Sequence, residues 1–132
     1  MQPFFLEHFG NPSSIHGFGR EVKVAIDEAR EKIATSIGAH PQEIVFTSGG
    51  TESNNAAIQG LIQSFAAPQH VITSRLEHPS VLMVSRELEK RGWKVSYVEP
   101  DGAGMITAEA VLRSLRPETA LIAIMHANNE VG

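Results

Sequence analysis

The feature that most constrains the fold of this sequence is the alternation of short apolar segments with longer amphipathic ones. The short segments have the length of strands, and the long ones repeat apolar residues every three or four positions, as helices do. Strands are predicted at residues 43–47, 70–74, 93–99 and 119–126. Helices are predicted at about 18–37, 51–65, 79–91 and 107–115, the last with Thr107 as its N-cap. This order predicts an α/β fold in which helices cover a sheet.

The first helix and the last strand have the clearest patterns. One helical face is formed by Val22, Ile26, Ala29, Ile33 and Ile37. Gly38 is predicted to end this helix as a C-cap. The strand at 119–126 is apolar on both faces, which predicts a buried position in the sheet. Because the sequence stops soon after that strand, we expect a piece of a longer protein, one partial domain spanning 1–132.

Composition excludes several classes of protein. The net charge is −4 and Lys and Arg are scattered, which argues against a nucleic-acid partner. The longest apolar run covers only residues 120–125, too few for a membrane span. The absence of cysteine excludes a disulfide, a thiolate metal site and a thiol nucleophile within these residues. No His-Glu-x-x-His spacing is present, so no metal site is predicted. A cytoplasmic location is the default expectation.

A Gly-Gly-Thr turn is the main candidate binding site. Gly49, Gly50 and Thr51 lie between a predicted strand and a predicted helix, where backbone N–H groups are free to bind an anion, most often a phosphate. The turn has neither the Walker sequence nor the dinucleotide-binding fingerprint. The alternative is a plain strand-to-helix turn with Thr51 as the helix N-cap.

Two further candidates lie at predicted strand exits, where ligands gather in open α/β sheets. His78 follows the strand at 70–74, and its ring could stack on a planar ligand or carry protons, although a loop histidine is more often simply exposed. Asn128 and Asn129 with Glu130 follow the last strand and form a hydrogen-bonding edge for a polar ligand. The alternative for the two asparagines is an ordinary turn.

Together these residues resemble the cysteine desulfurases, pyridoxal-phosphate enzymes of the class V aminotransferase family. They are most similar to the group that supplies sulfur for iron–sulfur clusters. The resemblance covers essentially the whole chain and rests on four motifs in order. These are Phe9-Gly10-Asn11-Pro12-Ser13-Ser14, residues 43–53, Glu77-His78, and His126-Ala127-Asn128-Asn129-Glu130-Val131-Gly132.

The resemblance implies a fold and a set of roles. The fold would be part of the large domain of a fold-type I pyridoxal-phosphate enzyme, with a mostly parallel sheet covered by helices. Gly50 and Thr51 would hold the cofactor phosphate. His78 would stack on the pyridine ring and assist proton transfer, and Asn129 would bind near the cofactor's phenolic oxygen and the substrate carboxylate. The whole enzyme would be a homodimer that converts L-cysteine to L-alanine and an enzyme-bound persulfide, with a sulfur-acceptor scaffold protein as a further partner.

The sequence also departs from the family pattern. In the family, the Asp that binds the pyridinium nitrogen, the Schiff-base Lys and the persulfide-forming Cys all follow the Asn-Asn-Glu-x-Gly motif. None of them lies within these residues, so this N-terminal fragment is expected to be inactive alone. The alternatives are another class V aminotransferase, a selenocysteine lyase, a non-catalytic binding module or a truncated gene product.

Overall fold

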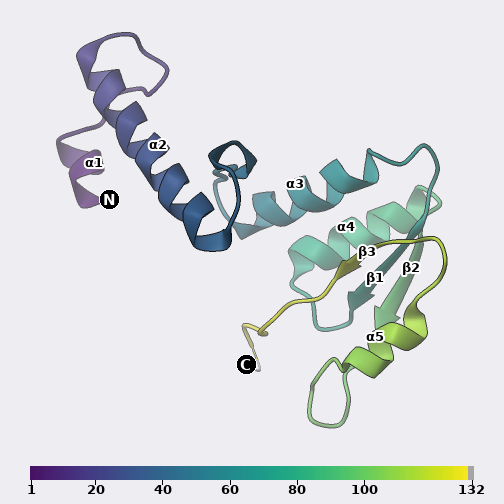
Figure 1. Ribbon diagram of the computed structural model, residues 1–132. Coiled ribbons are helices and arrows are strands. Elements are labelled where there is room, and N and C mark those ends of the chain that lie inside the picture. Colours follow the sequence, from purple (N-terminus) through teal and green to yellow (C-terminus); the bar gives the residue numbers. More distant parts are fainter. Residues whose placement is uncertain (131–132) are drawn as a thin grey trace. The chain divides into compact units, whose positions relative to one another are not determined.

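The computed structural model describes residues 1–130, which form six helical segments and three strands (Figure 1). In chain order the helices are α1 (Gln2–Leu6), α2 (Gly17–Ile37), the 3-10 helix η1 (Pro41–Glu43), α3 (Gly50–Ile62), α4 (Pro79–Lys90) and α5 (Ala108–Ser114). The strands are β1 (His70–Ser74), β2 (Lys94–Val98) and β3 (Thr119–Ala123). The chain divides into two compact units, Met1–Phe46 and Thr47–Gly132.

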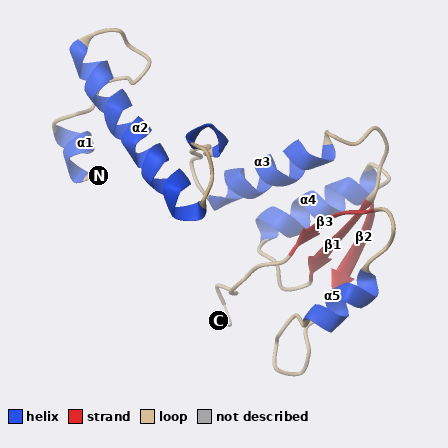
Figure 2. Cartoon of the chain, in the orientation of Figure 1, coloured by secondary structure: helices blue, strands red, loops and turns tan. Residues whose placement is uncertain are grey.

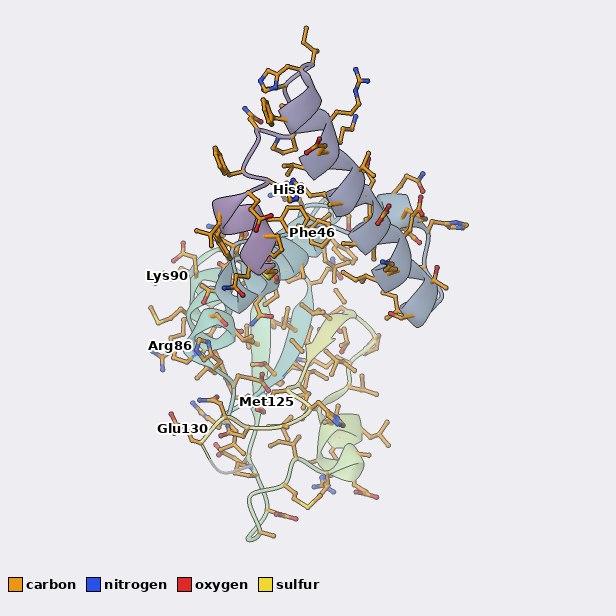
Figure 3. The ribbon with its side chains drawn as sticks, turned by 90° about the vertical axis from the view of Figure 1, so that its left-hand side faces the viewer. His8, Phe46, Arg86, Lys90, Met125 and Glu130 are labelled. Atoms are coloured by element: carbon orange, nitrogen blue, oxygen red, sulfur yellow. The ribbon has the colours of Figure 1, made fainter. Side chains whose placement is uncertain are left out.

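The first unit is helical and is built around α2. This helix follows the predicted bounds closely and ends at Gly38, whose φ of 68° is the left-handed conformation of a C-cap glycine. The turn before it is polar, and the Ser13 N–H donates to Asn11 Oδ1 at 2.9 Å. This turn approaches α2 so closely that a Cβ at Gly19 would collide with the Asn11 carbonyl oxygen, so glycine is required there. Phe46, labelled in Figure 3, lies under the Arg30 guanidinium, 4.9 Å from its ring centre.

The predicted strand at 43–47 is wrong. Its first residue, Glu43, ends η1, and its carboxylate accepts the N–H of His40 at 2.7 Å. The residues that follow are irregular, and Val45 is 76% exposed. A strand needs backbone partners on a neighbouring strand. The three described strands pair only with one another, so this apolar segment has no ladder to join.

The second unit contains a parallel sheet in the order β2-β1-β3, which confirms the α/β prediction (Figure 2). The chain crosses from β1 to β2 through α4 and returns over β1 to β3 through α5. The two crossovers run in opposite directions, so the right-handed rule places their helices on opposite faces. Figures 1 and 3 show α4 and α5 on opposite sides of the strands.

The core of this unit lies between α3, α4 and one face of the sheet. It is formed by the buried side chains Ile58, Ile62, Val71, Val81, Val84, Leu88 and Trp93. Phe65 packs edge-on against Trp93 with 6.0 Å between the ring centres. The helix predicted at 107–115 is α5, and its predicted N-cap is confirmed because Thr107 Oγ1 accepts the N–H of Ala110 at 3.2 Å.

The most buried strand of the described sheet is β1, whereas β3, for which burial is predicted, is only partly covered within this chain. Every residue of β1 is buried because it lies between the other two strands. In β3, by contrast, Ile122 is 47% exposed. Ile122 pairs with Ile72 of β1, which is fully buried. Both residues lie on the face of the sheet where α5 packs against β2 rather than β3, so α5 leaves Ile122 partly uncovered. Apolar composition therefore marked β3 as a strand but could not give its place in the sheet.

Candidate active site

The Gly-Gly-Thr turn opens helix α3, but Thr51 is not its N-cap. The N-cap is Gly49, and Thr51 is the second residue of the helix. The carboxylate of Glu52 reaches back and accepts both the N–H and the hydroxyl of Ser48 at 2.7 Å. These two hydrogen bonds hold the pKa of Glu52 below its usual range. The polar groups of the turn are thereby tied to one another, which orders the start of α3.

The backbone donors of Gly50 and Thr51 remain available in this arrangement. The first intrahelical bond runs from the Ser53 N–H to the Gly49 carbonyl at 3.1 Å. Among residues 1–130, no acceptor meets the N–H of Gly50 or of Thr51, and both residues are exposed. Two adjacent amides and a hydroxyl at the positive end of a helix dipole make a donor set suited to an anion.

His78 is the N-cap of helix α4. Its Nδ1 accepts the N–H of Ser80 at 3.1 Å and lies 2.8 Å from the Ser80 hydroxyl. The same hydroxyl accepts a hydrogen bond from Asn54 Nδ2 at 2.8 Å. Asn54 is in the second turn of α3 and Ser80 in the first turn of α4, so this bond holds the starts of the two helices side by side.

The exits of β1 and β3 are also joined. Glu77, which is 6% exposed, accepts the Met125 N–H at 2.8 Å and the Ser74 hydroxyl at 2.7 Å. Asn128 donates from Nδ2 to the Leu76 carbonyl at 2.8 Å and accepts the Glu130 N–H at 2.8 Å. In Figure 3, Met125 and Glu130 mark the segment that leaves β3. The loops that follow these neighbouring parallel strands therefore form one edge, as ligand-binding loops do in α/β sheets.

His78 lies between two hollows of about 430 Å³ each. One is lined by Asn54, Leu121, Met125 and other residues of α3, α4 and β3, and is largely apolar. The other is lined by residues at the exits of β1 and β3, most of them polar, among them Asn129. The structure thus brings the predicted residues His78 and Asn129 to one hollow. Thr51 reaches the same region through α3, because it precedes Asn54 by three residues, about 4.5 Å of helix.

Three residues that shape this region are not predicted from the sequence to have a role in the site. Asn54, Glu77 and Ser80 hold the neighbours of His78 in place, through bonds that span 26 to 48 residues of sequence. Glu77 and Ser80 lie on either side of the His78-Pro79 pair in the sequence. A short motif does not show which residues far along the chain will form hydrogen bonds with them. Val131 and Gly132, which end the fourth motif, lie outside the described residues.

No helix within residues 1–130 is both long and apolar enough to cross a bilayer. No cluster of three or more His, Asp or Glu side chains suited to a metal ion is present in the same range.

A family model and several known proteins match this chain. The model described as aminotransferase class V matches residues 1–132. The cysteine desulfurase IscS of Dictyoglomus turgidum is 53% identical over 100% of this chain and 34% of its own length. The putative cysteine desulfurase IscS 1 of Bacillus subtilis is 47% identical over 100% of this chain and 35% of its own length. The chain therefore spans about a third of the length of these relatives.

Solved structures agree with the sequence relatives. A NifS-like protein superposes with a TM-score of 0.89 at 39% identity, over 99% of this chain and 36% of the other. A structure described as SspA in complex with cysteine has a TM-score of 0.86 at 44% identity, over 98% of this chain and 38% of the other. The α/β fold is thus that of part of a fold-type I pyridoxal-phosphate enzyme. The chain belongs to the class V aminotransferase family, and within it to the cysteine desulfurase group.

Proposed function

We propose that this chain forms the phosphate-binding and ring-binding side of a pyridoxal-phosphate site in a cysteine desulfurase. The N–H groups of Gly50 and Thr51 and the Thr51 hydroxyl would bind the phosphate. His78 would lie against the pyridine ring and assist proton transfer. Asn129 would donate a hydrogen bond near the phenolic oxygen of the cofactor and the carboxylate of the substrate.

The observation that carries this proposal is the Asn54–Ser80 hydrogen bond. Through it, the start of α3 with its free N–H groups lies beside the start of α4, where the exposed His78 ring is held. Free amides, a hydroxyl, an exposed imidazole and a carboxamide suit the chemistry of a phosphorylated aromatic ring with polar substituents. The donor set therefore fits the cofactor that the family uses.

The whole protein would release sulfur from L-cysteine. L-cysteine and an enzyme thiol would give L-alanine and an enzyme persulfide, so that the sulfur atom passes to the thiol sulfur. Pyridoxal phosphate, when bound, supplies the electron-withdrawing ring that makes cleavage of the carbon–sulfur bond accessible. We further propose a homodimer, a sulfur-acceptor scaffold partner for iron–sulfur cluster assembly and a cytoplasmic setting. Since the 132 residues contain no cysteine, the chain alone is expected to release no alanine from cysteine.

The site is tested with pyridoxine 5′-phosphate, which has the ring and the phosphate but no aldehyde to react with the lysines of the chain. Titration of the ¹⁵N-labelled chain is expected to shift the amide resonances of Gly50 and Thr51. Thr51→Ala should weaken binding about tenfold, the effect of one hydrogen bond to a charged group. Pyridoxine without phosphate should leave the two amides unshifted.

Ser64→Ala is the matched control, because it removes a hydroxyl just beyond the opposite end of the same helix, where Ser64 donates to the Leu61 carbonyl at 2.6 Å. It should bind as the unmodified chain does. Equal affinities of the Thr51→Ala and Ser64→Ala variants, or shifts confined to residues away from α3 and His78, would overturn the proposed site.

A further inference from the structure

A chain of hydrogen bonds connects helix α3 to the ring of His78. Asn54 Nδ2 lies 2.8 Å from Ser80 Oγ, and Ser80 Oγ lies 2.8 Å from His78 Nδ1. Ser80 is only 7% exposed, whereas the His78 ring is exposed. The connection therefore runs from a half-buried amide through a buried hydroxyl to one nitrogen of an accessible ring.

All of these bonds run in one direction. The N–H of Ser80 points at His78 Nδ1 at 3.1 Å, and its hydrogen has a position set by the backbone, so Nδ1 faces it with its lone pair. Asn54 donates to the Ser80 oxygen, which leaves the single hydroxyl hydrogen to point at the same Nδ1. A neutral imidazole carries one hydrogen, and with Nδ1 as the acceptor that hydrogen is on Nε2.

We propose that Asn54 and Ser80 are positioning residues that hold neutral His78 in the tautomer protonated at Nε2. The free edge of the ring then offers a hydrogen-bond donor, and the ligand atom that meets it carries a lone pair. At this edge the neutral ring donates a hydrogen bond to the ligand and cannot accept one, because its only nitrogen lone pair is on Nδ1. The nature of the ligand rests on the proposed function, whereas the tautomer is a property of this chain without any ligand.

Asn54→Asp tests the proposal by reversing the direction of the bonds. An ionised carboxylate only accepts, so the Ser80 hydroxyl would turn toward Asp and present a lone pair to His78 Nδ1. The ratio of the Nε2–H to the Nδ1–H tautomer is expected to fall about tenfold or more. Asn54→Leu has nearly the same shape and leaves the Ser80 hydroxyl free to donate to Nδ1, so it should lower this ratio much less than Asn54→Asp does.

The tautomer is read from long-range ¹H–¹⁵N correlations of the histidine rings in the full 132-residue chain. Spectra are taken at about pH 8.5, two units above the reference histidine pKa. The signals of His78, one of six histidines, are identified by their loss in the His78→Gln variant.

Ser80→Ala supplies a second test that does not depend on the aspartate variant folding. Without the hydroxyl, Nδ1 keeps only the backbone N–H, and its ¹⁵N resonance should move toward that of a nitrogen with no hydrogen bond. In this background Asn54→Asp should no longer change the tautomer, because the connection is cut.

An Nδ1–H majority in the unmodified chain would overturn the proposal. So would an unchanged Nδ1 resonance in Ser80→Ala, or equal tautomer ratios in folded Asn54→Asp and Asn54→Leu. These results are independent of pyridoxine 5′-phosphate binding, so a failure of the cofactor site and a failure of this inference are distinguished.

Discussion

The carboxylate of Glu77 accepts the backbone N–H of Met125 at 2.8 Å, across 48 residues of sequence. The same oxygen accepts the hydroxyl of Ser74, the last residue of β1. Glu77 thus joins the loop that carries His78 to the segment that leaves β3 toward Asn129. The geometry of the candidate site depends on this buried carboxylate.

Glu77→Ala is therefore expected to destabilise the second unit. It leaves two donors without their acceptor, and we expect the free energy of unfolding to fall by about 2 kcal/mol. Glu77→Gln should cost about 1 kcal/mol, because the amide retains one acceptor oxygen. Urea denaturation followed by the fluorescence of Trp93, the single tryptophan, measures both.

Glu99→Ala is the control for these variants. Glu99 forms an ion pair with Arg75 at 3.0 Å, but its side chain is 70% exposed, and exposed pairs contribute little. A loss as large as that of Glu77→Ala would show that burial is not the deciding factor.

His70 is expected to make stability depend on pH. Its side chain is fully buried, with Nδ1 2.8 Å from Thr119 Oγ1 and Nε2 2.9 Å from Ser96 Oγ. Burial, reinforced by the charge of Arg116, lowers the pKa of His70 below its usual range. The unfolded chain then binds a proton more readily than the folded chain, so the free energy of unfolding should fall as the pH drops below about 6.5.

Urea denaturation at a series of pH values, repeated with His70→Gln, measures this effect. The variant should flatten the acid side of the curve, whereas His16→Gln, at an exposed position, should leave it unchanged. Identical pH slopes for the unmodified chain and His70→Gln would contradict the assignment to His70.

Tyr97, the only tyrosine, is expected to titrate late. Burial, together with the hydrogen bond from its hydroxyl to Glu89 Oε2 at 2.9 Å, raises the pKa of Tyr97 to about 12. The folded state therefore favours the neutral phenol. Its contribution to stability should be complete below the reference pKa of about 10 and should disappear as the pH rises toward 12.

Ultraviolet absorbance of the phenolate follows this titration directly. Glu89→Gln should lower the midpoint but keep it above the reference value, because the burial of the ring remains. Glu109→Gln, on the exposed side of α5, should have no effect. A midpoint near 10 in the folded chain would refute the prediction.

The sequence by itself determined most of the local structure. The helical periodicity of α2, the Gly38 cap, the Thr107 cap and the position of β1 all follow from interactions among near neighbours. The motifs also identified the family, because their order along the chain does not depend on packing. Gly50, Thr51, His78 and Asn129 were selected on this basis, and their roles stay predictions.

Only the tertiary structure decided which apolar segments pair as strands and where each strand lies in the sheet. Residues 43–47 and β3 are both apolar, yet the first forms no strand and the second lies at an edge, because a ladder depends on neighbours far away in sequence. The same reason applies to the site. The bonds from Asn54 to Ser80 and from Glu77 to Met125 join residues that only the packed helices and the parallel sheet bring within hydrogen-bonding distance.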